Sequence, residues 1–309
     1  MGKRQYERLA QNKFKKLIAF PGAVLNKLSS IQETLGRIES KINLQQNLTI
    51  DESEFKVYSQ WGEDGIIQYL INNIEIKNKV FIEFGVENYK ESNTRFLLVN
   101  NNWSGLVIDG DPKNIEVIKN DGISWRHNIK AEGSFITADN IDSIFSKNGI
   151  KGEIGILSVD IDGNDYWVWD SIKSVNPSIV ICEYNSLFGS SKKVTTPYKE
   201  DFVRFKEHYT FVYYGASISA LTELANLKGY SLVFGNSNGN NAFFVRNDLL
   251  GDLKVLTPKE AYVKANFRDS RDLEGNLDYL SFEDRVKLIE NLEVFDINKQ
   301  TIEKLKDAK

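Results

Sequence analysis

Cysteine, histidine and methionine are almost absent from this chain of 309 residues. Its one cysteine, Cys182, has no second thiol in the chain with which to form a disulfide, a redox pair or a cysteine-rich zinc site. Its two histidines, His127 and His208, are too few for a three-histidine metal centre. A bound metal would therefore have oxygen ligands, which suits Mg²⁺, Ca²⁺ or Mn²⁺, and catalysis would depend mainly on carboxylates, tyrosines and lysines.

The chain also lacks a strong charge of either sign and any long apolar run. Its 39 lysines and arginines and 43 acidic residues give a net charge of −4, which argues against a nucleic-acid partner. No apolar stretch reaches the roughly 18 residues of a membrane span. The segment most like a signal peptide, residues 17–25, is short, contains Pro21 and Gly22, and has no small-residue cleavage site. We therefore expect a cytoplasmic protein without a membrane span.

The first fifty residues differ from the rest. Residues 1–20 contain six basic residues and one acidic residue. This basic segment is compatible with contact to a membrane surface or with a solvent-exposed helix face. After Pro21 and Gly22, apolar residues recur in alternating steps of four and three: Val24, Leu28, Ile31, Leu35, Ile38 and Ile42. This heptad seam predicts either a coiled coil that forms a homodimer through residues 24–42 or a helix that packs its stripe on its own domain.

From about residue 55, predicted strands alternate with predicted helices. Apolar strands are expected at 79–86, 104–111, 153–162 and 177–185, with a weak strand at 124–129. Helices are expected at 64–73, 92–101, 112–120, 139–148 and 217–228, and a hairpin at 230–235 and 241–246. This order predicts an α/β fold with a Rossmann-like, doubly wound, mostly parallel sheet that ends in an antiparallel hairpin.

These patterns divide the chain into three parts. Residues 1–50 form a basic and heptad-bearing helical segment, and residues 55–250 form the α/β domain. Residues 251–309 are polar and partly helical, and we expect a C-terminal helical appendage there.

Acidic residues end each of the four apolar strands. They are Glu83 and Glu87 after the first strand, Asp109 and Asp111 after the second, Asp160, Asp162 and Asp165 after the strand at 153–162, and Glu183 after the strand at 177–185. Ligands of open α/β sheets bind beyond the carboxyl ends of the strands. Carboxylates that gather there repel one another, so they need a cation, a ligand rich in hydroxyls and amines, or raised pKa values.

The loop after the first strand narrows the choice of ligand. Its sequence, GVENYKESNT, has one glycine and two glutamates, a poor cradle for a pyrophosphate, and the chain has no GxxxxGK[ST] motif. An acid at the end of the second strand suits ribose hydroxyls. S-adenosylmethionine has a ribose, an ammonium group and a sulfonium charge but no phosphate, so it fits this edge better than a dinucleotide does.

The segment VDIDGND at 159–165 allows a second interpretation. It fails as an EF-hand loop, because Gly163 falls at position 4 instead of 6 and Ser171 stands at position 12. As a DxD motif, Asp160 and Asp162 would bind a divalent ion, such as Mg²⁺, and a nucleotide diphosphate. Strand alternation would place both aspartates on one side, a good arrangement for a shared ion.

Several of these segments resemble one known family. EFGVENYKESNT at 83–94, VIDGD at 107–111, LSVDIDGND at 157–165, PSIVICEYN at 177–185 and SQWGEDGII at 59–67 are similar to motifs of class I S-adenosylmethionine-dependent methyltransferases. The resemblance is strongest to the FkbM-like group, and it spans about residues 55–250. The chain departs from the family at one point: its first loop lacks the second and third glycines that are usual in that fold.

The resemblance implies a role for each matching residue. Glu83, Gly85 and Glu87 would line the methionine end of the cofactor. Asp109, or Asp111 in its place, would hold the ribose hydroxyls, and Asp139 and Asn140 would lie beside the adenine. Asp160, Asp162 and Asp165 would be catalytic, and Asp160 and Asp162 would be the ligands of a metal ion. Apart from the resemblance, Glu183, Tyr184 and Asn185 stand at the carboxyl end of the strand at 177–185, and we expect them to face the acceptor substrate together with Tyr214.

The expected activity is therefore S-adenosylmethionine-dependent O-methylation of a sugar or related polar metabolite. The resemblance places that acceptor in surface-polysaccharide biosynthesis. Two alternatives stay open: a DxD-type glycosyltransferase that uses a nucleotide sugar, and a non-catalytic scaffold that uses the methyltransferase fold.

Overall fold

The computed structural model describes residues 3–308, with side chains from residue 24 onward except residue 26. The chain divides into two units, residues 1–48 and 49–309. The first contains helix α1 (Lys3–Gln46), which includes the predicted heptad seam at 24–42 and continues through Pro21 and Gly22. Within the part of the chain so described, none of the helices combines the length and hydropathy that a transmembrane span requires.

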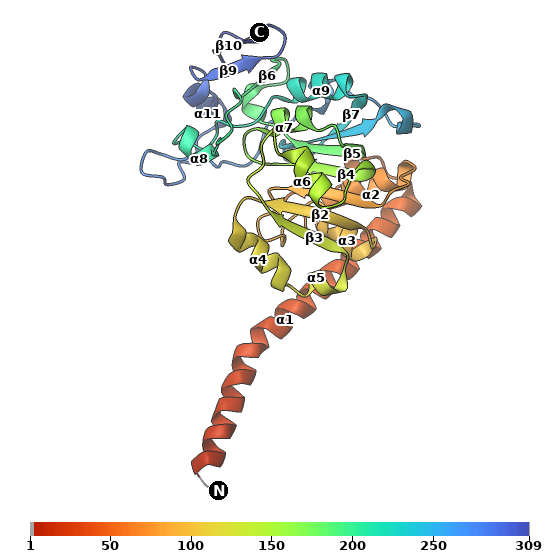
Figure 1. Ribbon diagram of the computed structural model, residues 1–309, viewed down its shortest axis with the longest axis vertical. Coiled ribbons are helices and arrows are strands. Elements are labelled where there is room, and N and C mark those ends of the chain that lie inside the picture. Colours follow the sequence, from red (N-terminus) through yellow and green to blue (C-terminus); the bar gives the residue numbers. More distant parts are fainter. Residues whose placement is uncertain (1–2, 309) are drawn as a thin grey trace. The chain divides into compact units, whose positions relative to one another are not determined.

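A seven-stranded sheet forms the centre of the second unit (Figure 1). Its strands, in spatial order, are β3 (Ile129–Gly133), β2 (Ser104–Asp109), β1 (Val80–Phe84), β4 (Gly152–Val159), β5 (Val175–Glu183), β8 (Asn241–Arg246) and β7 (Tyr230–Gly235). The first five are parallel, and β8 runs antiparallel to both β5 and β7. The predicted Rossmann-like sheet with its antiparallel hairpin is confirmed.

Helices cover both faces of this sheet, which explains why its central strands are apolar throughout. One face packs on α2 (Glu63–Asn73), α3 (Arg95–Asn100), α4 (Pro112–Asn120) and α5 (Ile123–Arg126). The opposite face packs on α6 (Ile141–Lys147), α7 (Asp165–Ser171) and α9 (Ile218–Leu227). The result is a three-layer arrangement with one hydrophobic core on each side of the sheet.

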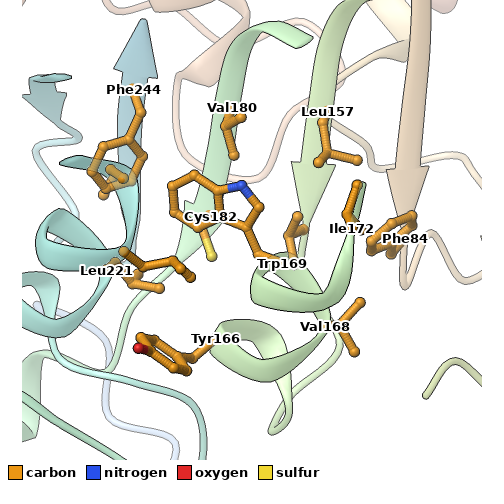
Figure 2. Close-up of a cluster of buried hydrophobic side chains, with 14 of the residues drawn as sticks. Phe84, Leu157, Tyr166, Val168, Trp169, Ile172, Val180, Cys182, Leu221 and Phe244 are labelled. Atoms are coloured by element: carbon orange, nitrogen blue, oxygen red, sulfur yellow. The ribbon is translucent and has the colours of Figure 1, made fainter. Parts of the chain in front are cut away.

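Trp169 lies at the centre of the second core (Figure 2). Its ring is 5.1 Å from that of Phe244 on β8, and only 1% of the residue is exposed. The thiol of Cys182 on β5 is buried in the same cluster. Cys182 is therefore part of the core, as its position in an apolar strand indicated.

The third strand differs from the prediction. Residues 123–126 form the short helix α5, and the strand follows at Ile129–Gly133, where it pairs with β2 in parallel. The side chain of Asp121 accepts a hydrogen bond from the backbone N–H of Ile123, which starts a helical turn. Trp125 is 77% exposed, which a strand covered on both faces would not permit. The prediction of a strand at 124–129 was wrong because this local turn overrides its few apolar residues.

The C-terminal residues do not form a separate helical appendage. They contain α10 (Pro258–Ala261) and α11 (Phe282–Ile289), but also β9 (Glu293–Asp296) and β10 (Thr301–Lys304). Strand β9 pairs with β6 (Val194–Thr195) in a three-stranded antiparallel sheet, and residues 49–309 form one unit. Short connections complete the chain: η1 (Asp51–Ser53), η2 (Ser186–Phe188), α8 (Arg204–Glu207) and η3 (Asn247–Leu249).

Gly65 on α2 provides a test of this packing. A Cβ atom at this position would lie 1.9 Å from the carbonyl oxygen of Ser53 and 2.4 Å from the backbone nitrogen of Phe55. Gly65→Ala should lower the free energy of unfolding by about 1–3 kcal/mol, although alanine normally favours a helix. At Gly133 the nearest atom would be 3.5 Å away, so Gly133→Ala should change stability by less than about 0.5 kcal/mol. If urea denaturation shows that Gly65→Ala and Gly133→Ala lower the free energy of unfolding equally, this packing is contradicted.

Candidate functional site

The carboxyl ends of β1, β2, β4 and β5 meet at one edge of the sheet because these strands are parallel neighbours. Gly85 follows β1 with φ +65°, and a Cβ there would lie 2.0 Å from the carbonyl oxygen of Asp160. Only glycine allows both this conformation and this contact. Gly85 therefore lets the loops after β1 and β4 touch, and this brings the acids of neighbouring strands together.

Glu83, the acid of β1, is buried and holds the loop that follows. Its carboxylate accepts hydrogen bonds from the Ser92 hydroxyl at 2.6 Å and from the backbone N–H groups of Asn93 and Thr94 at 2.8 and 3.0 Å. Burial raises its pKa, and these donors oppose the rise. Glu83 therefore lies at the predicted edge, where its hydrogen bonds shape the loop.

Asp109, at the end of β2, ties two loops together. One carboxylate oxygen accepts from the backbone N–H of Glu87 at 2.7 Å, and the other accepts from that of Asp111 at 2.8 Å and from the Asn114 amide at 3.0 Å. Asp111 is exposed and caps α4 by accepting from the N–H of Lys113. Of the two acids proposed for ribose, Asp109 is the one that faces a hollow.

That hollow, the β2 hollow, has a volume of about 220 Å³. Apolar and aromatic side chains form one part of its wall and acids form the other; it is lined by Gly85, Glu87, Ile108, Asp109, Gly110, Ser134, Phe135, Ile136, Asp160, Ile161, Asp162, Asn164 and Phe202. Asp139 and Asn140 are not part of this lining. Asn140 instead donates to the carbonyl of Phe135 and accepts from the N–H of Thr137. It thus shapes the loop that presents Phe135.

A second hollow adjoins the first and shares Gly85, Glu87, Asp160 and Asp162 with it. This Glu183 hollow has a volume of about 230 Å³. Polar groups dominate its wall; the other lining residues are Gln60, Glu83, Phe84, Val86, Glu91, Ser92, Asn93, Glu183, Arg204 and Asn241. The two hollows together form one continuous, acid-lined site at the carboxyl edge of the sheet.

Asp160, Asp162 and Glu183 lie where the hollows join. Each offers one carboxylate oxygen, and these oxygens are all within 4.8 Å of one another. Strand alternation does not produce this arrangement, because β4 ends at Val159 and Asp162 adopts φ +55°. The loop turns the aspartates together instead.

The electrostatics of this cluster are unusual. Burial and the neighbouring carboxylates raise the pKa of both Asp160 and Glu183 well above the ordinary range. Glu183 is 7% exposed, and its Oε2 atom has no hydrogen-bond partner among the described residues. The cluster therefore favours a bound cation or a proton shared between Asp160 and Glu183.

Asp165 is a structural residue, contrary to its predicted catalytic role. It is fully buried, lines neither hollow, and accepts hydrogen bonds from the backbone N–H groups of Ile161 at 2.8 Å and Gly163 at 2.9 Å. Both oxygens thus hold the loop that carries Asp160 and Asp162. Asp165 supports the acids of the cluster without facing the ligand space.

The other acceptor-side residues also differ from the prediction, except Glu183. Tyr184 lies on the opposite face of β5 from Glu183, is buried, and donates its hydroxyl hydrogen bond to the carbonyl of Val263. Asn185 is buried and donates to the carbonyls of Val212 and Tyr214. Neither Tyr184 nor Asn185 lines either hollow.

Arg204, at the start of α8, is a site residue that the sequence analysis missed. Its guanidinium donates to Asp162 at 2.7 Å, to Asp269 and to the carbonyl of Phe211, and it lies over the Tyr214 ring at 3.9 Å. Tyr214 therefore supports Arg204 and does not line the hollows. No local motif reveals Arg204, because it is 42 residues from Asp162 in the chain.

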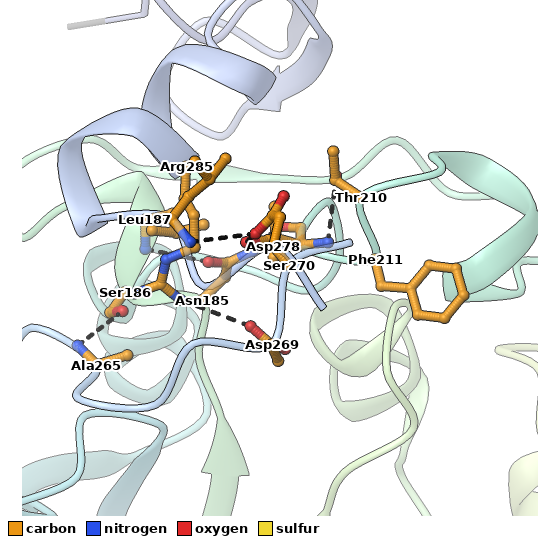
Figure 3. A network of polar contacts seen from close by, with 12 residues as sticks. Asn185, Ser186, Leu187, Thr210, Phe211, Ala265, Asp269, Ser270, Asp278 and Arg285 are labelled. Atoms are coloured by element: carbon orange, nitrogen blue, oxygen red, sulfur yellow. Dashed lines mark hydrogen bonds and ion pairs between the residues drawn. The ribbon is translucent and has the colours of Figure 1, made fainter. Parts of the chain in front are cut away.

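The C-terminal segment reaches the site through this arginine. Asp269 also contacts Arg285 of α11, with 3.5 Å between the charged atoms (Figure 3). Arg285 is 2% exposed and lies near Asn185 and Leu187. Alternating charges thus extend from α11 through Asp269 and Arg204 to Asp162.

The raised pKa of Asp165 yields a pH prediction. Burial raises this pKa to about 6, although the two backbone N–H groups oppose the rise. An acid with a higher pKa in the folded protein stabilises it below the unfolded pKa of about 3.9, and that contribution is lost as the pH rises through 6. Between pH 4 and 7, the free energy of unfolding should therefore fall on the order of 3 kcal/mol more in the wild type than in Asp165→Asn. If the free energy of unfolding from urea denaturation varies with pH in the same way in the wild type and in Asp165→Asn, the raised pKa of Asp165 is contradicted.

Comparisons with known proteins give likenesses in structure only. No protein-family model matches the chain, and no curated protein matches it. An O-methyltransferase from Bacillus cereus, solved with S-adenosylhomocysteine, matches with 11% identity and a TM-score of 0.38 over 68% of this chain and 89% of that one. A Staphylococcus aureus protein named for caffeoyl-CoA O-methyltransferase activity matches with 14% identity and a TM-score of 0.40 over 69% and 99%.

PKMT2 from Rickettsia typhi, solved with S-adenosylhomocysteine, matches with 9% identity and a TM-score of 0.40 over 62% of this chain. The match covers 54% of PKMT2, so this chain spans about half the length of that protein. Likenesses at these TM-scores carry no argument about function. The fold assignment rests on the strand order and pairing described above.

Proposed function

We propose that this protein is an S-adenosylmethionine-dependent methyltransferase that methylates an oxygen of a sugar or related polar metabolite. The observation that carries the proposal is the continuous acid-lined site at the carboxyl edge of β1, β2, β4 and β5. Its position agrees with the general location of ligands in open α/β sheets. Its negative charge favours a ligand with positive charges and hydroxyl groups over a ligand with phosphate groups.

The β2 hollow suits the nucleoside part of this cofactor. Phe135 and Phe202 offer aromatic surface for an adenine ring, and Asp109 offers carboxylate oxygens for ribose hydroxyls. No lysine, arginine or histidine is among its described lining residues, whereas four of them are acidic. A phosphate group would be repelled there, and a ligand with ammonium and sulfonium charges would be attracted.

The same charge argues against a nucleotide-sugar transferase. Arg204 is the one basic side chain among the described residues that line either hollow. It is already paired with Asp162 and Asp269. A nucleotide diphosphate would therefore depend entirely on a divalent ion for charge neutralisation.

The acceptor would lie in the Glu183 hollow. Most of its lining side chains are polar, which favours a hydroxylated acceptor over a planar aromatic one. The resemblance to the FkbM-like group supports a sugar from surface-polysaccharide biosynthesis as that acceptor.

The reaction requires positioning and the removal of one proton. S-adenosylmethionine, when bound, supplies an electrophilic methyl group. Asp160 and Glu183 are the groups available to accept the proton from the acceptor hydroxyl, since a raised pKa makes a carboxylate a stronger base. Arg204 and the hydrogen bonds of Asp165 hold the surrounding loop, so the acceptor meets a fixed geometry.

As an alternative to accepting a proton, the same cluster fits a divalent cation. Asp160, Asp162 and Glu183 supply the oxygen ligands that Mg²⁺ and Mn²⁺ prefer, and the unpartnered Oε2 atom of Glu183 is a free ligand position. Such an ion would offset the repulsion among the acids and acidify a nearby hydroxyl.

Calorimetry with S-adenosylhomocysteine tests the cofactor assignment. We expect binding to the wild type, at least tenfold weaker binding to Asp109→Asn, and unchanged binding to Asp111→Asn, whose side chain still caps α4. A tenfold loss corresponds to about 1.4 kcal/mol. If S-adenosylhomocysteine does not bind the wild type at millimolar concentration, the methyltransferase proposal is contradicted. Binding of a nucleotide sugar with Mn²⁺ in its place would favour the glycosyltransferase, and binding of neither ligand would favour the scaffold.

Electron paramagnetic resonance with Mn²⁺ tests the cation site. Asp160→Asn and Glu183→Gln should each weaken Mn²⁺ binding at least tenfold, about 1.4 kcal/mol, because each removes a charged ligand. Glu91→Gln is the matched control, since Glu91 lines the Glu183 hollow outside the cluster. If all three variants bind like the wild type, the cluster is not the cation site.

A further inference from the structure

The heptad seam of α1 presents an exposed apolar stripe. Its six side chains, Val24, Leu28, Ile31, Leu35, Ile38 and Ile42, are each between 41% and 59% exposed. They recur with the spacing that places them in one line along a helix. A row of branched aliphatic side chains in water indicates a surface that is covered by another chain.

The register of the seam indicates how many helices it would join in a coiled coil. A step of three leads from an a position to a d position, and a step of four leads from d to the next a. Leucine therefore occupies two of the three a positions, and every d residue is β-branched. The a residues are Leu28, Leu35 and Ile42, and the d residues are Val24, Ile31 and Ile38.

This distribution is the reverse of a two-stranded pattern. Parallel dimers favour β-branched residues at a and leucine at d, because the Cα–Cβ bond at d points directly at the partner helix and a β-branched side chain is crowded there. Leucine at a with isoleucine at d favours higher-order coiled coils, in which the packing at a and d is exchanged. The seam therefore disfavours the homodimer, which was one of the two interpretations of its periodicity.

We propose that α1 joins four copies of this chain in a parallel coiled coil through residues 24–42. Two features of the flanking positions agree with four strands. Leu25, at an e position, is apolar and 64% exposed, and four-stranded coils bury more of their e and g positions than dimers do. The seam is also short, about three heptads after Pro21, and such a helix gains more burial from two neighbours than from one.

The charges beside the seam favour the parallel orientation. In a parallel coil, g residues pair with the following e residues of the next helix, so Lys27 would face Gln32, Thr34 would face Glu39, and Lys41 would face Gln46. None of these pairs joins like charges. An antiparallel coil would place g residues opposite one another and bring Lys27 near Lys41 of another copy.

Sedimentation of the full chain tests the number of copies. The wild type should sediment with about four times the chain mass of 35.3 kDa. A variant with the a and d residue types exchanged should have twice the chain mass, because it restores the two-stranded pattern; its changes are Val24→Leu, Leu28→Ile, Ile31→Leu, Leu35→Ile and Ile38→Leu. Ile31→Lys, which places a charge in the seam, should be monomeric.

The alternative outcomes are equally specific. A wild type of one, two or three copies at micromolar concentration overturns the four-stranded assignment. Four copies that persist in Ile31→Lys would place the interface outside α1 and overturn it as well. Circular dichroism of each variant shows that the domain is folded, so a change in mass reports on assembly.

Cross-linking tests the orientation. Residue 45 continues the seam at a d position, and a parallel coil brings its four copies together, so Gln45→Cys should form interchain disulfides on oxidation. The natural thiol of Cys182 is buried and does not compete. Failure of Gln45→Cys to cross-link in a four-copy assembly would contradict the parallel arrangement.

Discussion

Mutual repulsion among carboxylates is the constraint on which the site depends. A parallel sheet brings the carboxyl ends of its strands to one edge, and here each central strand delivers an acid to that edge. Most of these charges are offset by partners within the protein. Glu83 and Asp165 have backbone and hydroxyl donors, Asp109 ties two loops, and Asp162 pairs with Arg204. Each such acid organises a loop while its own charge is compensated.

The acids left over are the chemically available ones. Asp160 and Glu183 lie beside each other with raised pKa values, and one oxygen of Glu183 has no partner among the described residues. Both the raised pKa values of these two acids and their attraction for a cation arise because negative charge is buried there without a compensating partner. The surrounding hydrogen bonds keep the loops in place, so the charge is not relieved by movement. Asp160 and Glu183 are thus the reactive pair because the neighbouring acids already have hydrogen-bond or ion-pair partners.

The sequence predicts the sheet and the acidic edge because both arise from local patterns. Apolar runs mark the buried strands, and the acids follow them directly, so Asp109, Asp160 and Glu183 were found without knowledge of the fold. Arg204 could not be found in this way, since its contact with Asp162 is made by tertiary packing. The roles of Tyr184 and Asn185 were misread because adjacency in sequence was taken for adjacency in the site. Strand alternation turns Tyr184 to the opposite face.

The chain of charges from α11 to Asp162 also has a consequence for how the protein is made. Arg204 is held by Asp269, which in turn contacts Arg285, and β6 pairs with β9 about a hundred residues later in the chain. During synthesis the sheet and its acids emerge from the ribosome well before these partners do. The acids and Arg204 are therefore made early, and the contact that holds Arg204 in place is made late. A ribosome-bound chain that has passed residue 250 would hold every residue of the acid cluster together with Arg204, yet the contact between Arg204 and Asp269 would form only when the last segment folds back.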